Sequence, residues 1–272
     1  MSPRPLAGVL GHPVAHSLSP AIHNAAYRAV GLDWRYVKLP VPPERLAEVV
    51  AALPASGYRG ANVTIPHKLA ALELANEVSA AAGEIGAANT LTFRDGRVEA
   101  DNTDAAGLIE AIETPVSAMR VVVLGAGGAG RAAAWALREA GAAEVAVWNR
   151  TGDRAAALAR ELGVSHAPRP FDAPADLLVN ATSVGLDAGE CANDALRALG
   201  LLDREPPEIV VDLVYRADGG ETPVLAWGRG GGARVVDGIE VLVRQGARSF
   251  ERWTGKTAPL DVMRAAARGE SA

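Results

Sequence analysis

Lys68 and Asp104 are the two residues of this 272-residue sequence that best suit acid–base chemistry. Pro66 predicts the start of a helix, which would place Lys68 in the first helical turn. A lysine is electrostatically unfavourable there, because the positive end of the helix dipole repels cations, and this weakens a purely solvent-exposed role. Asp104 could simply cap the helix expected over 105–112. Alternatively, its carboxylate could pair with a lysine in a cleft and help to orient a substrate hydroxyl.

The residues just before this lysine alternate polar and apolar side chains, as a half-buried strand does. Asn62 and Thr64 should share one face and Val63 and Ile65 the other, because side chains alternate along a strand. We therefore predict that the apolar pair packs in the core while the polar pair faces a ligand. His67 is expected to be structural or exposed and not catalytic.

Two serines stand close to a predicted helix start. Ser19 precedes Pro20, which is the pattern of an N-cap followed by proline at the first helical position. Capping does not explain Ser17, and two hydroxyls at a helix N-terminus suit a small carboxylate as ligand. Asn89 and Thr90 form a further polar cluster, which we expect at the same cleft.

A glycine-rich turn predicts a nucleotide site. Residues 120–124 form an apolar, β-branched run that is typical of a buried parallel strand, and a helix is expected after the turn. Gly125, Gly127 and Gly130 match the G-x-G-x-x-G pattern. In this pattern one glycine permits a tight turn, one lets the backbone approach a pyrophosphate and one allows close packing of the helix. The pyrophosphate would bind at the helix N-terminus, where unpaired N–H groups and the dipole favour an anion.

The end of the next predicted strand, 144–148, distinguishes between NAD and NADP. An NAD site places Asp or Glu there, to accept a hydrogen bond from the ribose 2′-hydroxyl. This sequence has Asn149, Arg150 and Thr151, followed by Arg154. Guanidinium groups suit bidentate phosphate binding, and cations at a helix start are otherwise unfavourable. We therefore predict NADP as the cofactor.

Composition limits the classes of partner. The chain has 27 Lys and Arg against 32 Asp and Glu, a net charge of −5, which argues against nucleic acid as the main partner. Because no apolar run is long enough to span a bilayer and no secretion leader is evident, we expect no membrane partner. Cys191 is the sole cysteine, which excludes a disulfide framework and a cysteine metal cluster. We expect a cytoplasmic protein without a metal, either monomeric or homodimeric.

Strand and helix patterns alternate along the chain, which indicates an α/β fold with parallel sheets. We expect strands at 6–10, 34–39, 61–65, 120–124, 144–148, 177–181, 209–213 and 234–236, and a hairpin of 90–93 with 98–100. The Asp95-Gly96 pair is a strong turn for that hairpin. Helices are expected at 20–30, 44–53, 66–76 and 105–112, after the glycine turn up to 140, and beyond 238.

This order predicts two domains. Residues 1–103 would form an α/β substrate domain, and 104–237 a doubly wound Rossmann domain that binds NADP. The helices of 238–272 would return to the first domain. Because ligands in such folds bind at the carboxyl ends of strands, we expect the substrate in a cleft between the two halves.

These motifs resemble those of the shikimate dehydrogenase family. Matching segments run in order over nearly the whole chain: Ser17-x-Ser19, Asn62 to Lys68, Asn89-Thr90, Asp101 to Asp104, the Gly125 turn, Asn149 to Arg154, Asn180 to Ser183, Asp212 to Tyr215, and Asp237-Gly238 through Gln245 to Gly255. Several independent motifs make the resemblance more specific than any single one.

The resemblance implies NADPH-dependent, reversible reduction of 3-dehydroshikimate to shikimate, an oxidoreductase step towards chorismate and the aromatic amino acids. It implies that Lys68 is the acid–base group and that Asp104 holds the geometry. Substrate contacts are implied for Ser17, Ser19, Asn62, Thr64, Lys68, Asn89, Asp104, Tyr215 and Gln245. Cofactor contacts are implied for Gly125, Ala126, Gly127, Gly128, Ala129, Asn149, Arg150, Thr151, Arg154, Thr182, Leu213 and Gly238.

Departures from the family pattern gather around the expected nicotinamide site. The loop 216–221 is longer than usual and lacks a proline that is often found there. Val241 replaces a common methionine, and Leu213 stands at a variable position. These differences concern the packing beside the nicotinamide and not the class of reaction.

Two alternatives stay open. Quinate or a related hydroxy acid could be the substrate, although the Ser17-x-Ser19 pair and the arginines favour shikimate and NADP. The chain could also be a ligand sensor that kept its pocket and lost its chemistry. The joint presence of Lys68 and Asp104 argues against that second alternative.

Overall fold

The computed structural model describes residues 4–171, 174–216 and 218–270. Its contacts divide the chain into two compact units: unit 1 comprises Met1–Gly107 and Leu242–Ala272, and unit 2 comprises Leu108–Val241. The chain passes between the units inside helices α5 (Asp104–Ile112) and α10 (Gly238–Thr254). The functional division into 1–103, 104–237 and 238–272 stays a prediction about which segments bind substrate and which bind cofactor.

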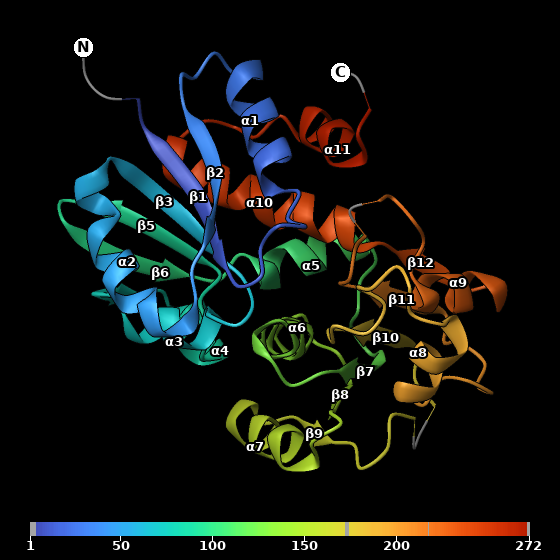
Figure 1. The fold of residues 1–272 in the computed structure, drawn as a ribbon. Coiled ribbons are helices and arrows are strands. Elements are labelled where there is room, and N and C mark those ends of the chain that lie inside the picture. Colours follow the sequence, from blue (N-terminus) through green and yellow to red (C-terminus); the bar gives the residue numbers. More distant parts are fainter. Residues whose placement is uncertain (1–3, 172–173, 217, 271–272) are drawn as a thin grey trace. The chain divides into compact units, whose positions relative to one another are not determined.

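Unit 1 contains a six-stranded sheet with the order β2-β1-β3-β5-β6-β4 (Figure 1). Its strands are β1 (Leu6–Gly11), β2 (Arg35–Pro40), β3 (Tyr58–Val63), β4 (Glu77–Val78), β5 (Thr90–Arg94) and β6 (Arg97–Asp101). Strands β1, β2 and β3 are parallel, whereas β5 runs antiparallel to β3 and pairs with β6. The hairpin predicted around Asp95-Gly96 is therefore confirmed, and it makes this sheet mixed.

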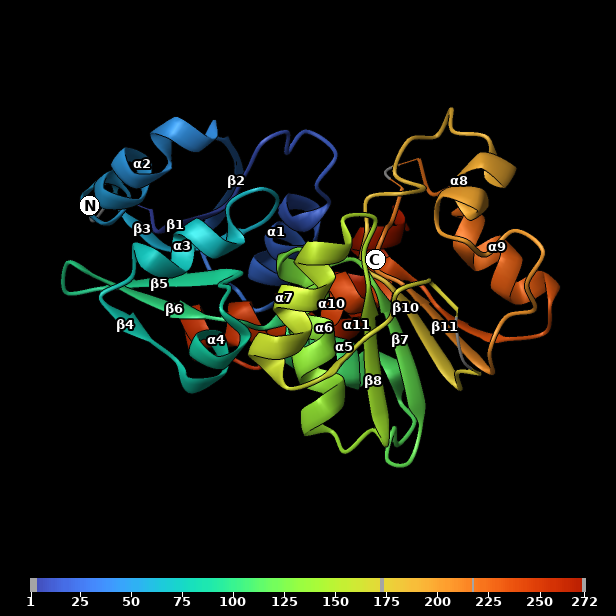
Figure 2. The same cartoon turned by 90° about the horizontal axis from the view of Figure 1, so that it is seen from below.

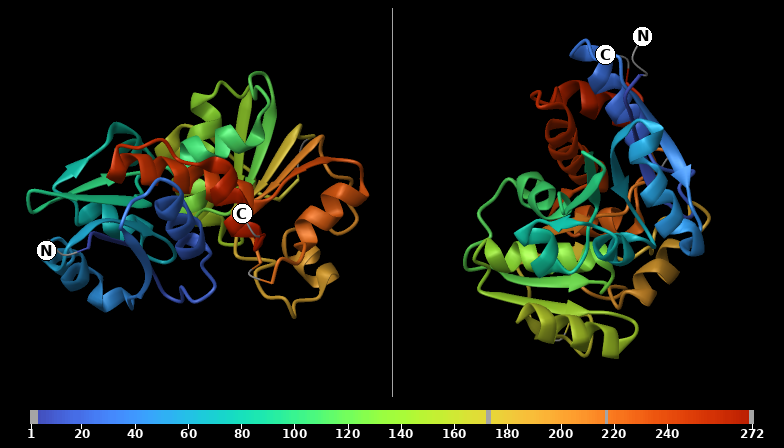
Figure 3. Two further views of the ribbon diagram at one scale, coloured as in Figure 1. Left: turned by 90° about the horizontal axis from the view of Figure 1, so that it is seen from above. Right: turned by 90° about the vertical axis from the view of Figure 1, so that its left-hand side faces the viewer.

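Helices cover both faces of the unit 1 sheet. They are α1 (Ser19–Ala29), α2 (Leu46–Ala52), α3 (Lys68–Glu73), α4 (Ala80–Ile85), α11 (Leu260–Arg268) and most of α10, with 3-10 turns at Pro43–Arg45 and Pro54–Ser56. On one face, Val50 of α2 joins the core formed by Val63 and Leu91. On the other, Trp253 of α10 lies so close to Gly60 that any side chain there would collide with the indole. Helix α11 packs against α1 (Figure 3).

Unit 2 contains a second six-stranded sheet, in which every strand is parallel to its neighbours. Its strands are β7 (Arg120–Leu124), β8 (Glu144–Trp148), β9 (Ser165–His166), β10 (Leu177–Asn180), β11 (Ile209–Asp212) and β12 (Arg234–Val236). The order β9-β8-β7-β10-β11-β12 is the doubly wound arrangement of dinucleotide-binding domains, so the predicted fold class is confirmed. The direction of winding reverses between β7 and β10.

Alternate side chains of β7 supply the two cores of unit 2. Val121 and Val123 pack in the core that contains residues of α5, α6 (Gly128–Glu139) and α7 (Gly152–Leu162). Val122 and Leu124 pack in the core that contains residues of α8 (Ala192–Ala198) and α9 (Pro223–Gly230). Figure 2 shows α6 and α7 on one side of this sheet and α8 and α9 on the other.

Several observed bounds differ from the predicted ones. The strand expected over 61–65 ends at Val63, and the helix expected over 66–76 is α3, which begins at Lys68. The helix expected over 44–53 begins as a 3-10 turn. None of the helices in the described residues has the length and apolar character needed to cross a membrane.

Candidate active site and cofactor site

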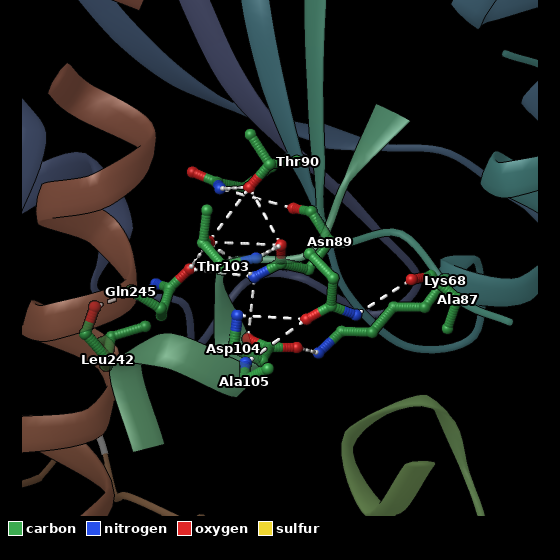
Figure 4. A network of polar contacts seen from close by, with 11 residues as sticks. Lys68, Ala87, Asn89, Thr90, Thr103, Asp104, Ala105, Leu242 and Gln245 are labelled. Carbon is green, nitrogen blue, oxygen red and sulfur yellow. Dashed lines mark hydrogen bonds and ion pairs between the residues drawn. The ribbon is translucent and has the colours of Figure 1, made fainter. Parts of the chain in front are cut away.

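A short ion pair joins the two residues predicted to do the acid–base chemistry. Lys68 Nζ lies 2.5 Å from Asp104 Oδ2, and the two side chains are 12% and 19% exposed (Figure 4). Lys68 lies in the first turn of α3, as predicted, although the helix begins at Lys68 itself and not at Pro66, and Asp104 is the first residue of α5. The pairing of a lysine with a carboxylate is therefore confirmed as a contact, whereas its catalytic role stays a prediction.

Asn102 leaves Asp104 available for this contact. The backbone N–H groups of Asp104 and Ala105 lie 3.1 and 3.4 Å from Asn102 Oδ1, to which they donate. Asn102 thus occupies the capping role that the simpler interpretation gave to Asp104. Asp104 Oδ1 instead accepts from Asn89 Nδ2 at 2.8 Å. The N-cap interpretation of Asp104 is wrong, because the Asn102 side chain already accepts from the backbone N–H groups at the start of the helix.

Asn89 connects the ion pair to α10. Besides Asp104, its amide nitrogen lies 3.0 Å from Thr103 Oγ1 and 3.2 Å from Gln245 Oε1 (Figure 4). Its oxygen accepts from the Thr103 backbone N–H at 2.7 Å. Asn89, Thr103 and Gln245 are all buried. Four of the predicted substrate residues, Lys68, Asn89, Asp104 and Gln245, therefore lie together, and Thr103 joins them although the sequence assigned it no role.

Asn62 is fully engaged with protein partners. Its oxygen accepts from Tyr36 Oη at 2.8 Å and lies 3.5 Å from Ser249 Oγ, while its nitrogen lies 3.3 Å from the Asn89 carbonyl oxygen and 3.2 Å from Thr90 Oγ1. An amide has two N–H donors and two lone pairs, so these contacts use its whole capacity. This geometry favours a role for Asn62 in holding Asn89, and direct substrate contact stays a prediction.

The segment after Asn62 departs from the predicted alternation. Val63 packs in the core as expected, but Ile65 is 61% exposed. The prediction for Ile65 is wrong because β3 ends at Val63, so strand alternation no longer applies. Thr64 is half-buried, with its methyl group close to Gly11. His67 is buried with its Nε2 at 2.7 Å from the Val41 carbonyl oxygen, which supports the expected structural role.

Ser17 and Ser19 come together at the start of α1, but not in the predicted capping arrangement. Both are buried, and their hydroxyl oxygens lie 3.2 Å apart. The helix begins at Ser19, and the capping position, Leu18, supplies no side-chain hydrogen bond. Instead, Ser17 Oγ accepts from the Ser19 backbone N–H at 3.3 Å. The N-cap prediction for Ser19 is wrong, because α1 already begins at Ser19 and the cap position falls on Leu18.

Two of the three motif glycines of unit 2 have the functions predicted for them, and the third leaves open space where the pyrophosphate is predicted. Gly125 has φ +110°, and a Cβ there would lie 2.8 Å from the Ala181 carbonyl oxygen. At Gly130 a Cβ would lie 2.0 Å from the Gly125 carbonyl oxygen, so the helix packs directly on the turn. At Gly127, which caps α6, no heavy atom lies within 4 Å of a Cβ. The turn and packing glycines are thus Gly125 and Gly130, and Gly127 leaves room for a ligand at the helix N-terminus.

The residues after β8 suit a phosphate. Asn149 Oδ1 accepts from the Ala126 backbone N–H at 3.3 Å, which ties the end of β8 to the glycine turn. Arg150 and Arg154 are exposed, and neither forms an ion pair within the part of the chain that the structure describes. Two unpaired guanidinium groups at the start of α7 leave positive charge available for an anion.

The remaining predicted cofactor residues gather at the ends of β10 and β11. The Thr182 backbone N–H donates to Asn180 Oδ1 at 3.1 Å. A Cβ at Gly238 would lie 2.7 Å from the carbonyl oxygens of both Leu213 and Val214. The structure therefore brings Leu213 and Gly238 together, and their contact with the cofactor stays a prediction.

Tyr215 is half-buried and belongs to unit 2, whereas the cluster around Asn89 belongs to unit 1. The contact of Tyr215 with the substrate stays a prediction. Sequence analysis missed Thr103 and Asn102, although both lie inside the quoted segment before α5. An Asx residue two positions before a helix start was the pattern that could have identified Asn102 as the cap. Within the described residues, no group of three or more His, Cys, Asp or Glu side chains could hold a metal ion.

Family models match three segments of the chain. The shikimate dehydrogenase substrate binding domain matches residues 9–91, and the shikimate / quinate 5-dehydrogenase model matches residues 108–184. The shikimate 5′-dehydrogenase C-terminal domain matches residues 238–268.

Curated relatives and solved structures cover almost the full length. A shikimate dehydrogenase (NADP(+)) from Methanocella arvoryzae is 44% identical over 273 residues, which is 96% of this chain and 97% of that protein. A Thermus thermophilus shikimate 5-dehydrogenase, solved with NADP(H) and shikimate, has a TM-score of 0.85 at 43% identity and covers 97% of this chain and 99% of its own. The 5-ketofructose reductase of a Gluconobacter strain has a TM-score of 0.83 at 30% identity and covers 99% of each chain. With full-length relatives at this level of identity, the chain belongs to the shikimate dehydrogenase family.

Proposed function

We propose that this protein catalyses the reversible, NADPH-dependent reduction of 3-dehydroshikimate to shikimate, a step on the route to chorismate and the aromatic amino acids. The observation that carries the proposal is the Lys68–Asp104 ion pair at 2.5 Å, anchored by the buried Asn89 network. It places a proton donor among hydroxyl and amide groups that suit a polyhydroxylated acid.

When bound, NADPH would supply the hydride, with its two electrons, to the ketone carbon. Negative charge then develops on the ketone oxygen, where the Lys68 ammonium stabilises it and donates a proton. The resulting neutral amine is protonated again from solvent. In the reverse direction the neutral amine accepts the hydroxyl proton, and the hydride would return to NADP⁺. Asp104 accepts from both Lys68 and Asn89, so it fixes the position of Nζ relative to the network.

The residues of unit 2 fit an NADP cofactor. Gly125 to Ala129 would hold the pyrophosphate at the α6 N-terminus, where Gly127 offers open space. Arg150 and Arg154 would hold the 2′-phosphate, with Asn149 and Thr151 beside the adenosine ribose. Thr182, Leu213 and Gly238 would contact the nicotinamide half.

The substrate's carboxylate would be held by the Ser17 and Ser19 hydroxyls. Its ring hydroxyls would be held by Thr64, Asn89 and Gln245, with Tyr215 as a further contact; these members of the predicted substrate set have side-chain groups that can donate or accept. Asn62 would act mainly by positioning Asn89.

A second ketone class deserves a direct comparison. One family model bears the name shikimate / quinate 5-dehydrogenase, and a 30% identical structural relative is named as a 5-ketofructose reductase. Quinate and open-chain or cyclic polyols are therefore the alternative substrates to test. A sensor without chemistry is disfavoured by the intact Lys68–Asp104 pair.

The deciding experiment measures NADPH formation by absorbance with shikimate, quinate and fructose, each offered with NADP⁺ and NAD⁺. We expect the highest kcat/KM for shikimate with NADP⁺. A higher kcat/KM for another polyol would assign that ketone class instead, and no turnover of any pair would favour the sensor.

Lys68→Ala tests the role of the ammonium. We expect kcat to fall by about 10²-fold or more, because the developing oxyanion loses its proton donor, while shikimate binding is comparatively retained. Circular dichroism of the variant provides the folding control. An unchanged kcat in a folded Lys68→Ala protein would remove this lysine from the mechanism.

The remaining proposals concern context. From the sequence alone we propose a substrate domain at 1–103, an NADP domain at 104–237 and a return of 238–272 to the first domain. We also propose a monomeric or dimeric state and a cytoplasmic location. Size-exclusion chromatography with light scattering would settle the oligomeric state.

A further inference from the structure

The position of the nicotinamide half on unit 2 follows from the two ends of the cofactor that can be placed. This step rests on the proposed function. If the pyrophosphate binds at the Gly127 turn after β7, and the 2′-phosphate binds Arg150 and Arg154 after β8, the adenosine half extends towards β8. The nicotinamide half must then extend across the point of reversed winding, over the carboxyl ends of β10 and β11.

A buried polar network ties these two strand ends together. Asp212, the last residue of β11, accepts from Asn180 Nδ2 at 2.8 Å and from the Val214 backbone N–H at 3.0 Å through Oδ1. Its other oxygen accepts from Thr222 Oγ1 at 2.5 Å. Asn180, Asp212 and Thr222 are 0%, 0% and 1% exposed. No water can therefore replace any of these contacts without a rearrangement of the strand ends.

The network extends into the groups that would touch the cofactor. Asn180 Oδ1 accepts from the Thr182 hydroxyl at 2.7 Å and from its backbone N–H at 3.1 Å. On the other side, Asp212 holds the Val214 N–H, and the adjoining Leu213 and Val214 carbonyls pack against Gly238. The Asp212 carboxyl group and the Asn180 amide thus hold Thr182, Leu213 and Gly238 in position.

Stability alone does not account for an acidic group here. Burial raises the pKa of Asp212 to about 7, in spite of hydrogen bonds from Thr222, Val214 and Asn180 that lower it. Buried ionisable networks are often no more stable than well-packed apolar side chains of similar volume. A network at this position is better explained by the geometry that it fixes, because hydrogen bonds specify direction and apolar contacts do not.

We propose that Asp212 is a positioning residue for hydride transfer. Through Asn180 and Val214 it fixes the backbone at the ends of β10 and β11, and these backbone segments form the surface on which the nicotinamide ring rests. Asp212 itself touches neither the cofactor nor the substrate in this proposal.

The test separates the two halves of the cofactor. Calorimetry measures the Kd of NADP⁺ and of the fragment adenosine 2′,5′-bisphosphate, which keeps the 2′-phosphate and lacks the nicotinamide mononucleotide half, and stopped-flow absorbance measures single-turnover hydride transfer. For Asp212→Ala we expect hydride transfer to slow on the order of 10²-fold, as small misplacements of reacting groups do. The Kd of NADP⁺ should rise by about tenfold, which corresponds to the free energy of one hydrogen bond. The Kd of the fragment should stay within about twofold of the parent value.

Two variants serve as controls. Asp212→Asn should restore most of the hydride-transfer rate, because its amide can accept from Asn180 and Val214 and donate to Thr222. Arg150→Ala should weaken NADP⁺ and the fragment equally, because both carry the 2′-phosphate. If Asp212→Ala fails to fold, Thr222→Val replaces it, because this change removes one donor of the same network, and Thr222→Ser is its control. Thr222→Val should weaken NADP⁺ more than the fragment, as Asp212→Ala does, but to a smaller degree.

The outcomes are distinguishable. Equal losses of affinity for NADP⁺ and the fragment in Asp212→Ala, or in Thr222→Val where that replaces it, would make the network a support of the whole fold and overturn the proposal. So would hydride transfer at the parent rate. A parent protein that binds neither NADP⁺ nor the fragment would instead refute the proposed cofactor, before the variants are compared.

Discussion

Ser17 and Ser19 use their hydroxyl groups differently, although the two side chains lie side by side. Ser17 Oγ accepts the Ser19 backbone N–H and donates to Ser19 Oγ. The Ser19 hydroxyl proton has no hydrogen-bond acceptor within the described residues, which leaves it available to a carboxylate. Ser17 is therefore the residue that supports the backbone, and Ser19 is the residue better placed to donate to a ligand.

This difference predicts opposite orders of stability and affinity. Ser17→Ala should lose roughly 1 kcal/mol of folding free energy, because a buried backbone N–H loses its acceptor, and should lower Tm by roughly 2–4 °C. Ser19→Ala should melt closer to the parent and raise the KM for shikimate more. Thermal melting and shikimate KM of both variants are the measurements. If Ser19→Ala melts earlier than Ser17→Ala, Ser19 supports the helix start after all.

At the scale of elements, the turn between β7 and α6 combines two demands on glycine that differ in kind. At Gly130 the demand comes from the protein, since a Cβ would lie 2.0 Å from the Gly125 carbonyl oxygen. At Gly127 the protein makes no demand, because the surrounding space is open and its φ of −87° suits any residue. Only a ligand in that space would require glycine there.

Alanine substitutions separate these two demands. Gly130→Ala should destabilise the protein by about 1–3 kcal/mol, because backbone atoms must move to accommodate the methyl group. Gly127→Ala should keep the parent's stability and weaken NADP⁺, since the methyl group would occupy the space for the pyrophosphate. Urea unfolding and NADP⁺ titration of the two variants test this pair. Normal NADP⁺ affinity in Gly127→Ala would place the pyrophosphate elsewhere.

At the scale of the whole molecule, local patterns predicted what depends on neighbouring residues. The strand–turn–helix around Gly125 and the hairpin at Asp95-Gly96 follow from residues within a few positions, and both are confirmed. The prediction that Ile65 is buried failed, because no local pattern marked the end of β3 at Val63. The Asn180–Asp212 contact joins residues on separate strands, so it depends on sheet order and could not be found from spacing.

Two buried ionisable groups give the units opposite responses to pH. In unit 1, His23 is completely buried against Tyr36, at a ring distance of 4.3 Å, and burial lowers its pKa from 6.5 to about 3. Neither of its ring nitrogens has a hydrogen-bond partner within the described residues. In unit 2, burial raises the pKa of Asp212 from 3.8 to about 7. The folded state is therefore favoured when His23 is deprotonated and when Asp212 is protonated.

The signs of the two effects follow from which state binds the proton. As pH falls from 6.5 towards 3, the unfolded chain protonates His23 and the fold does not, so the stability contributed by neutral His23 is lost on acidification. As pH rises from 3.8 towards 7, the unfolded chain deprotonates Asp212 first, so its contribution is lost on alkalinisation. Each slope approaches about 1.4 kcal/mol per pH unit, and in the parent they oppose each other.

Removing either group should therefore reveal that group's own contribution to the pH dependence of stability. Urea unfolding between about pH 4 and 7, expressed as variant minus parent, cancels the titration of all unchanged groups. For His23→Phe, which keeps an aromatic ring in the stack, this difference should be most favourable at low pH and should decline as pH rises, because only the parent is penalised by acid. For Asp212→Asn the difference should grow with pH, because only the parent must bury a carboxylate. Difference curves that stay flat over this range would mean that His23 and Asp212 titrate in the fold as they do in the unfolded chain, and the opposed responses of the two units would not exist.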